Sequence, residues 1–282
     1  MTDKRLPRQG GTDGNDDPPA IWVGYGKLLK LHRKRAGLNQ EQLAEAMVYS
    51  LHQIASVEQG RRPAKLHFTE TAERVLDAGG NLLALQEQVD LARLPVFFRD
   101  FAALEADAIS FFWYGGYVVP GLPQTEDYAR ALLSAHFPPL GEEVVEQRVE
   151  ARMERQSSLS RKNPPLVATF VIEEVVLRRP VGGSAVMKAQ LRKLLEQAQL
   201  PNVQVQVMPT SFGAHSGLNG SMVLLETTEH RRVAYTESQD ISSTVHEARK
   251  VGDFWLRYGM LRSQALNLEE PARLIECAAG EL

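Results

Sequence analysis

Apolar residues recur every three to four positions through the first 90 residues, which is the spacing of amphipathic helices. Val23, Leu28 and Leu31 follow this spacing together with Arg35, and Gly37 ends the helix that they define. Further stops divide the rest of the segment into short units. The pattern predicts helices over residues 22–36, 40–47, 51–58, 68–77 and from about 81 onward.

Two capping residues place the second and third helices of this run. Asn39 precedes residues 40–47, with the acid Glu41 in the first turn, and Ser50 precedes residues 51–58. Side-chain oxygens of Asn and Ser accept hydrogen bonds from the free amides of a first turn, where the helix dipole also favours an acid. We therefore predict two short helices joined by a three-residue turn.

The periodicity changes beyond about residue 94, where aromatic, helical and strand-like segments follow one another. Helices are expected over residues 126–133, 141–159 and 186–199, and a last helix around residues 254–261. β-Branched or alternating runs predict strands over residues 166–177, 203–208, 221–227 and 231–237. This mixture predicts an α+β domain with a small, largely antiparallel sheet, behind an all-α N-terminal domain.

Composition divides the chain further. Residues 1–20 are rich in Gly, Asp and Pro, so we expect a disordered tail without a secretory signal. We assign residues 21–90 to a helix-turn-helix domain and residues 91–282 to the α+β domain. No apolar run approaches the ~20 residues that span a bilayer, so no membrane segment is expected. For the single cysteine, Cys277, we expect a buried thiol.

The charge is distributed unevenly along the chain. The whole chain has a formal net charge of −3, yet residues 21–66 contain eight basic and three acidic residues. This window carries +5, so the remainder sums to −8. A compact basic module joined to an acidic body is typical of a DNA-reading head with a separate regulatory part.

The string LKLHRKRAGLNQEQLAEAMVYSLHQIASVEQGRRP, at residues 29–63, resembles the helix-turn-helix of the phage-repressor (Cro/C1, or XRE) family. Its apolar residues are suited to a small core between two crossing helices, and Ala44 is small where the backbones must approach. These core residues are Leu43, Ala44, Met47, Ile54 and Val57. The outer side of the third helix is then free to enter a major groove.

The resemblance implies a role for each of ten residues. The base-reading positions are Leu51, His52 and Ser56. The phosphate-binding positions are Asn39, Gln40, Arg61, Arg62 and Lys65. Arg33 and Glu58 match a structural ion pair that joins the first helix to the third.

Two features depart from the family pattern. Val48 occupies the turn position where the family usually has Gly, and a β-branched residue is poorly suited to a positive φ, so we expect a non-standard turn. The recognition face is also poor in Arg and Gln, which predicts modest base readout. A helical bundle without a DNA role is the alternative interpretation.

Four motifs in the second domain resemble the domain that follows such modules in many actinobacterial regulators, described as Scr1-type or antitoxin-like. They are VVPGLPQTEDYARALL, RVEARMERQ, EEVVLRRPVGGSAVMKAQL and NVQVQVMP. Pro123 departs from the family, which commonly has Leu there. The resemblance implies a regulator that acts with a small companion protein encoded nearby.

Candidate catalytic residues are sparse. Glu173 and Glu174 are adjacent in a predicted strand, so their carboxylates are expected to face opposite sides. His215 lies in a Gly-rich loop without a GxSxG pattern. His246 has no second His at helical spacing. We therefore expect no enzyme activity, no metal site and no cofactor.

Two further features leave alternatives open. A segment with two cations and two glycines joins a strand to a helix, and it suits either an anion site or a glycine-permitted connection. Its residues are Arg178, Arg179, Gly182, Gly183 and Ser184. An aromatic cluster around Trp113 suits either a core or a partner surface.

These observations predict a sequence-specific DNA-binding transcriptional regulator in the cytoplasm, associated with the nucleoid when bound. One helix-turn-helix reads half a site, so we expect a homodimer on double-stranded DNA, whose C-terminal domain dimerises or binds a small protein or ligand. The alternative is an antitoxin-like module that neutralises a companion protein and binds DNA only for autoregulation. A third hypothesis is an enzyme fused to a DNA-binding domain, which is the least supported because no nucleophile and base converge in the sequence.

Overall fold

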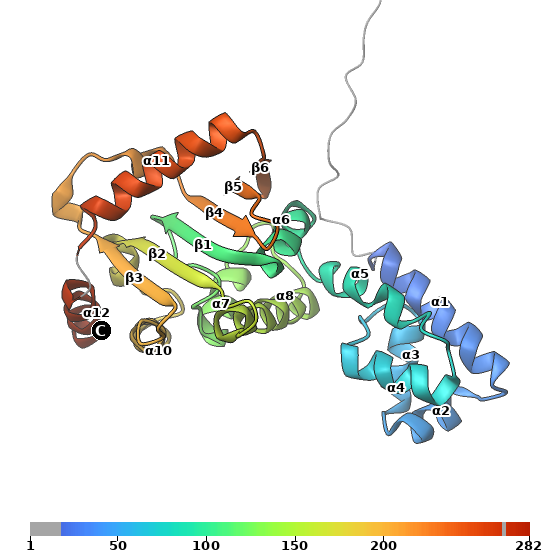
Figure 1. Cartoon of the computed structure of the whole chain (residues 1–282). Coiled ribbons are helices and arrows are strands. Elements are labelled where there is room, and N and C mark those ends of the chain that lie inside the picture. The colour runs from blue at the N-terminus through green and yellow to red at the C-terminus, as the bar shows by residue number, and fades with distance from the viewer. Residues whose placement is uncertain (1–17, 267–268) are drawn as a thin grey trace, which may run out of the picture. The chain divides into compact units, whose positions relative to one another are not determined.

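The computed structural model describes residues 18–266 and 269–282 and divides into two compact units, 1–96 and 97–282 (Figure 1). Most of the expected disordered tail, residues 1–17, lies outside the described residues. Its last residue, Ala20, begins the first helix. The boundary between the units lies six residues beyond the one that the sequence suggested, because Ala92 still belongs to the N-terminal core.

The N-terminal unit consists of helices. They are α1 (Ala20–Arg35), α2 (Gln40–Met47), α3 (Leu51–Glu58), α4 (Leu66–Leu76), the 3-10 turn η1 (Leu83–Leu85) and α5 (Gln86–Leu91). The predicted bounds of α2 and α3 are confirmed, as are their caps. The Asn39 side chain accepts from the amide of Gln42 at 2.8 Å, and the Ser50 hydroxyl accepts from that of Gln53 at 3.1 Å.

The buried face of α1 differs from the one that the apolar spacing indicated. Trp22, Tyr25 and Leu29 are buried, whereas Leu31 is 44% exposed. The polar atoms of Trp22 and Tyr25 also form hydrogen bonds. The Trp22 indole donates to the carbonyl of Val89 at 3.0 Å. The Tyr25 hydroxyl lies 2.7 Å from the hydroxyl of Thr69 on α4. Large buried aromatics with satisfied polar atoms therefore set the orientation of α1.

Helices α1 and α3 approach at Gly26. A Cβ atom there would overlap the backbone carbonyl groups of Val57 and Glu58. Gly24, on the same helix, has nothing within 4 Å of the corresponding position. The absence of a side chain at Gly26 is therefore what allows the two backbones to touch.

Three successive helices end in the same left-handed motif. Gly37 follows α1 with φ 72°, Val48 follows α2 with φ 60°, and Gly60 follows α3 with φ 70°. In each case the next amide donates to a carbonyl five residues earlier, as in Tyr49 to Ala44 at 2.9 Å, which is the Schellman arrangement. The expectation of a non-standard turn at Val48 is therefore wrong, because the valine adopts the conformation that glycine usually supplies.

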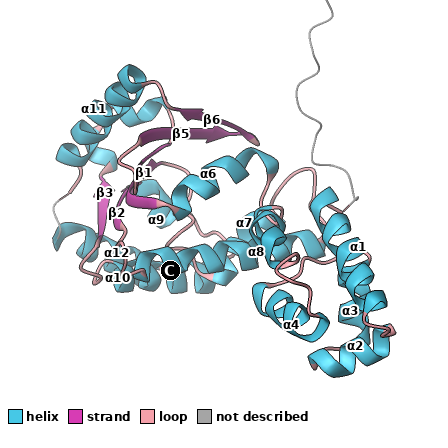
Figure 2. Cartoon of the chain, turned by 45° about the vertical axis from the view of Figure 1, so that its right-hand side comes forward, coloured by secondary structure: helices cyan, strands magenta, loops and turns pink. Residues whose placement is uncertain are grey.

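The C-terminal unit contains one six-stranded sheet with helices around it (Figure 2). The strands are β1 (Ala108–Gly115), β2 (Val167–Glu173), β3 (Val203–Met208), β4 (Met222–Thr227), β5 (Arg232–Ser238) and β6 (Ile241–Val245). The helices are α6 (Val96–Ala106), α7 (Glu126–Ser134), α8 (Glu142–Arg155), α9 (Glu174–Arg178), α10 (Ser184–Gln197), α11 (Ala248–Gln264) and α12 (Glu269–Glu281), with 3-10 turns at η2 (Gln156–Ser160), η3 (Thr210–Phe212) and η4 (Ser216–Asn219).

The sheet has the strand order β3-β2-β1-β4-β5-β6. The pairs β1–β2 and β2–β3 are parallel, and the remaining three are antiparallel. The α+β class is confirmed, but the expected largely antiparallel sheet is instead mixed, because two of its strand pairs are parallel. The predicted strand over 166–177 ends at Glu173, and α9 begins at Glu174. Helix α11 is followed by a further helix, α12.

Helices cover both faces of this sheet (Figure 1). One core lies against α6, α7, α10 and α12, and it includes Phe111 and Phe170. The other lies under α11, where Phe112 packs with Trp255 and Tyr258 at ring-centroid distances of 5.0 and 5.5 Å. Neighbouring aromatics of β1 therefore serve opposite cores, which favours the core interpretation of the aromatic cluster.

The expectation of a buried thiol at Cys277 is wrong, because this residue lies on the exposed side of α12. Ile275 and Ala278 occupy the side of that helix that packs into the core. Among the described residues, no helix is both long enough and apolar enough for a membrane crossing.

The approach of α1 to α3 predicts opposite effects for two alanine substitutions in one helix. Gly26→Ala should destabilise the N-terminal unit by about 2 kcal/mol, because a methyl group is forced into the α3 backbone. Gly24→Ala should stabilise it by about 0.5 kcal/mol, because alanine is the better helix former and meets nothing there. Urea denaturation followed by circular dichroism measures both, and equal effects would contradict the assigned contact.

The turn between α2 and α3 predicts a stabilising substitution. Val48 is 90% exposed, so Val48→Gly removes left-handed strain without loss of packing and should raise the free energy of unfolding by about 1 kcal/mol. Val48→Ala, the control, keeps a Cβ atom and should give a clearly smaller gain. Thermal melts of the three chains make the comparison. A Val48→Gly variant less stable than the parent chain argues against a strained turn.

Candidate nucleic-acid interface

Helix α3 presents one exposed strip. Leu51 and His52 are exposed, and Gln59, just beyond the helix, is exposed as well. Ala55, half-buried, lies between them at helical spacing. Sequence reasoning missed Gln59, although its spacing of eight residues from Leu51 places it on the same side.

Ser56 does not belong to this strip, and its predicted base-reading role is wrong. The residue is 1% exposed. The chain that follows α3 turns back over it, since the amides of Arg61 and Arg62 both donate to the Ser56 carbonyl, at 2.9 and 3.4 Å. A side chain enclosed in this way is out of reach of a base edge.

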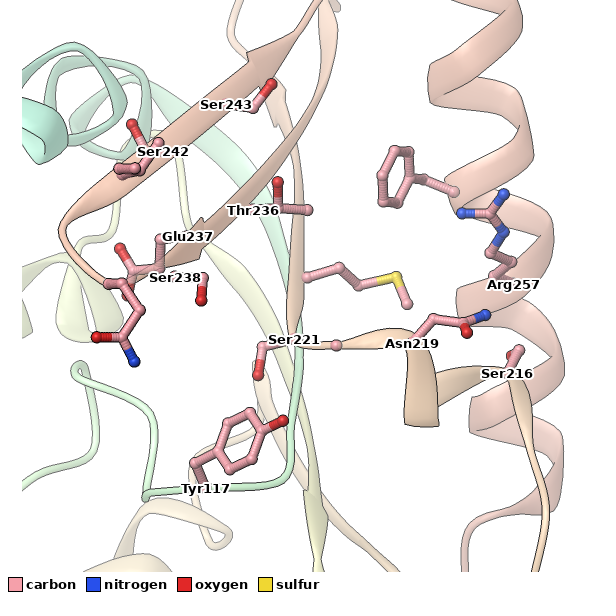
Figure 3. Close-up of a pocket in the computed structure, with 15 residues that line it drawn as sticks. Tyr117, Ser216, Asn219, Ser221, Thr236, Glu237, Ser238, Ser242, Ser243 and Arg257 are labelled. Atoms are coloured by element: carbon pink, nitrogen blue, oxygen red, sulfur yellow. The ribbon is translucent and has the colours of Figure 1, made fainter.

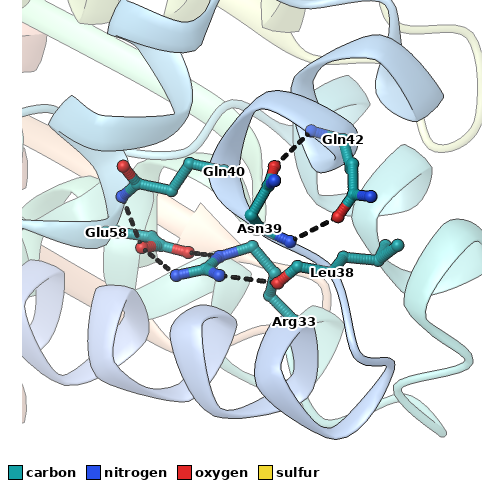
Figure 4. Close-up of polar contacts among 6 residues, drawn as sticks. All are labelled: Arg33, Leu38, Asn39, Gln40, Gln42 and Glu58. Atoms are coloured by element: carbon teal, nitrogen blue, oxygen red, sulfur yellow. Dashed lines mark hydrogen bonds and ion pairs between the residues drawn. The ribbon is translucent and has the colours of Figure 1, made fainter.

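The predicted ion pair between Arg33 and Glu58 forms, and it is part of a larger network (Figure 4). The Arg33 guanidinium donates to both Glu58 oxygens, at 2.5 and 3.0 Å, and to the Leu38 carbonyl at 2.8 Å. Both side chains are almost fully buried. The hydrogen bond to Glu58 raises the pKa of Arg33 above its usual value, so the guanidinium stays charged.

Gln40 joins the same carboxylate. Its side-chain amide donates to Glu58 at 2.8 Å, so this nitrogen is occupied within the unit (Figure 4). Asn39 is occupied in part as well, because it forms a reciprocal capping box with Gln42. What this end of α2 offers an anion is then its first-turn backbone amides and the helix dipole.

The three cations assigned to phosphate binding follow α3 directly. Arg61, Arg62 and Lys65 are all exposed. The Arg61 guanidinium donates to the Gln59 side chain at 2.8 Å, which places it beside the exposed strip. Sequence and structure thus bring an exposed recognition strip, a helix N-terminus and a cationic segment into one small unit.

The Gly-rich segment before α10 fits a tight connection better than an anion site. Arg178 is paired with Glu174 at 3.2 Å and Glu281 at 2.6 Å, so its charge is already balanced. Gly182 has φ 70°, and a Cβ atom there would press on Val186 and Ala131. Steric need therefore explains this glycine. Arg179, Gly183 and Ser184 lie exposed along the same segment.

Glu173 and Glu174 do not converge. Glu174 is the first residue of α9. Its carboxylate accepts a hydrogen bond from the amide of Thr210 at 3.0 Å, which lowers the pKa of Glu174. Glu173 instead accepts from the Tyr114 hydroxyl at 2.6 Å and lies 3.3 Å from the His215 imidazole. Sequence reasoning missed this cluster, since its members come from three distant segments.

The Glu173 cluster suits a structural role. Burial and the neighbouring carboxylate raise the pKa of Tyr114 far above its usual value, so the phenol keeps its proton and acts as a donor. Gly217 packs directly against the Tyr114 ring. Within the described ranges, no group of three or more His, Cys, Asp or Glu side chains is arranged to hold a metal ion.

A shallow pocket of about 740 Å³ lies between the β5–β6 hairpin, the segment 216–222 and α11 (Figure 3). Its lining is rich in hydroxyl groups, with two aromatic rings, one carboxylate and one guanidinium beside them. The polar side chains include those of Tyr117, Ser216, Ser221, Thr236, Ser238, Ser243 and Arg257. The Ser216 hydroxyl is buried and forms no hydrogen bond among the described residues. The pocket therefore suits a small polar ligand, and no motif in the sequence indicated it.

Comparison with known families agrees with this division into two units. Residues 25–86 match a family described as helix-turn-helix domain. No curated protein and no solved structure is detectably similar to the chain. Residues 98–277, more than half of the chain, match a second family, and the chain belongs to it: the family described as domain of unknown function (DUF5753).

Proposed function

We propose that this chain is a sequence-specific DNA-binding transcriptional regulator of the Cro/C1 (XRE) type. It acts as a homodimer on double-stranded DNA, in the cytoplasm and on the nucleoid. The second unit is proposed to be the Scr1-type domain of actinobacterial regulators, which dimerises or binds a small companion protein or ligand. The helix-turn-helix match supports the DNA-binding part of this proposal.

The observation that carries the proposal is the exposed strip of α3, which lies opposite the polar network of Arg33, Gln40 and Glu58. Leu51, His52 and Gln59 face outward, while the carboxylate of Glu58 on the inner side holds α1 and α2. A recognition helix needs this division, because its outer residues must enter the major groove without loss of the inner contacts.

The proposed readout assigns the strip and its flanks different tasks. The His52 imidazole donates to a guanine edge, Gln59 pairs with an adenine edge, and Leu51 contacts a thymine methyl group. Arg61, Arg62, Lys65 and the N-terminus of α2 at Gln40 bind phosphates and set the register. Few of these contacts are bidentate, so the proposed discrimination between sequences is modest.

For the second unit we propose a regulatory role without catalysis. The hydroxyl-rich pocket is the proposed ligand site, and the proposed role of the Glu173 cluster is to stabilise the fold. The antitoxin-like alternative makes the companion protein the main target. Promoter occupancy in cells separates the two, because a regulator binds several promoters and an autoregulatory antitoxin binds its own.

The first DNA prediction concerns salt. The logarithm of the binding constant of the full chain for a duplex of its own promoter should fall linearly with the logarithm of salt concentration, because phosphate contacts release counterions. Arg61→Ala should reduce the magnitude of the slope by about one unit. Fluorescence anisotropy at four or more salt concentrations measures it.

A matched control for this experiment is Arg192→Ala, since Arg192 is an exposed arginine on α10, far along the chain from the helix-turn-helix. It should leave the slope unchanged. The proposed function fails if the intact chain shows no salt-dependent binding to any duplex tested.

The second DNA prediction concerns sequence preference. His52→Ala and Gln59→Ala should change which duplexes are selected from a random pool, each mismatch being worth about 1–3 kcal/mol. Ser56→Ala, on the same helix but enclosed, should leave the selected sequence unchanged. An altered preference in the Ser56 variant, with none in the other two, would refute the assigned strip.

A further inference from the structure

Strand β6 forms one edge of the sheet, because the strand order pairs it with β5 alone (Figure 2). The opposite edge, β3, is partly covered, since the amide of Leu266 donates to the Val207 carbonyl at 2.9 Å. Gln206 on β3 also points its side chain toward the carbonyls of this covering segment. β6 is therefore the edge at which the sheet can be extended by another strand.

The turn before β6 determines which of its backbone groups face outward. Gln239 and Asp240 have φ of 51° and 60°, so the hairpin has a two-residue turn of type I′. In such a hairpin the residues that flank the turn, Ser238 and Ile241, exchange both hydrogen bonds. Alternation then directs the amides and carbonyls of Ser242 and Thr244 away from β5.

Nothing in the sequence of β6 blunts this edge. Its five residues, ISSTV, include no charge and no proline, which are the usual protection of a free edge strand. Ile241 is 74% exposed and lies at the end of the strand. Outward amides beside an exposed β-branched side chain form a surface that favours the addition of a strand.

We infer that a second copy of this chain supplies that strand, through antiparallel pairing of β6 with its own counterpart. The inference rests on the proposed function for its symmetry, because a two-fold dimer matches a palindromic operator. Pairing of β6 with itself is two-fold by construction, whereas a foreign strand would leave the two helix-turn-helix units unrelated.

The outward groups fix the register of this pairing. Ser242 exchanges both hydrogen bonds with Thr244 of the second copy, which places Ser243 opposite its own counterpart. Ile241 then covers Val245 of the second copy, so two β-branched side chains meet on the same face. Asp240 falls opposite His246, and no like charges oppose each other anywhere from 240 to 246.

Disulfide trapping tests the register directly. In a Cys277→Ser background, Ser243→Cys should form a covalent dimer on mild oxidation, because a non-hydrogen-bonded pair has Cα atoms about 4.5 Å apart. Ile241→Cys is the matched control, on the same strand and face. Its two copies would lie about 14 Å apart and should not cross-link. Equal trapping of both variants, or of neither, overturns the inference.

Charge exchange tests the same contact without oxidation. Ser243→Lys and Ser243→Glu each place like charges opposite each other, so each should weaken the dimer by up to about five-fold. An equimolar mixture should recover dimers that contain one copy of each, as native mass spectrometry would show. Two single variants that both dimerise as tightly as the parent chain overturn the pairing.

Duplex binding by the same preparations separates this inference from the proposed function. A chain that cross-links at residue 243 but binds no duplex supports the β6 pairing and refutes the proposed function. A chain that places two copies on a palindromic duplex, yet does not cross-link at residue 243, refutes the pairing and leaves the proposed function intact.

Discussion

The buried carboxylate of Glu58 determines how the N-terminal unit presents its recognition helix. It accepts hydrogen bonds from Arg33 on α1 and from Gln40 on α2, while Glu58 itself belongs to α3. One side chain therefore fixes three helices at the point where Gly26 lets α1 touch α3. The desolvation of such a pair offsets much of its attraction, so its contribution lies in the fixed arrangement more than in net stability.

Local signals made the helix-turn-helix predictable from sequence. Asn39 and Ser50 each cap the helix that the pattern assigned to them, because a cap depends on residues only three positions away. The ion pair was also predictable, but only through resemblance, since Arg33 and Glu58 are 25 positions apart. Val48 shows the limit of propensity, because the surrounding helices impose on it a backbone conformation that valine disfavours.

Features that depend on tertiary packing escaped the sequence. β1 lies between β2 and β4 and is covered on both faces, so its run of aromatic residues has no alternation to reveal a strand. Ser56 has the spacing of an outward residue, and only the fold of the following segment encloses it. The Glu173 cluster and the hydroxyl-rich pocket are likewise assembled from segments that are far apart along the chain.

A dimer built on β6 would be weak by itself, and this weakness suits a DNA-binding protein. Only two residues on each copy supply the backbone hydrogen bonds of this contact. The surface that such a contact buries is far smaller than the ~1,200 Å² of a stable interface. In the proposed dimer, two recognition helices on one duplex would raise the effective concentration of the two second units, so DNA binding and dimerisation would reinforce each other. Because Ile241 and Ser243 also line the hydroxyl-rich pocket, a ligand there would contact the same strand that forms the dimer. In the proposed dimer, β6 would therefore connect a cavity that suits a small ligand to the contact that pairs the recognition helices.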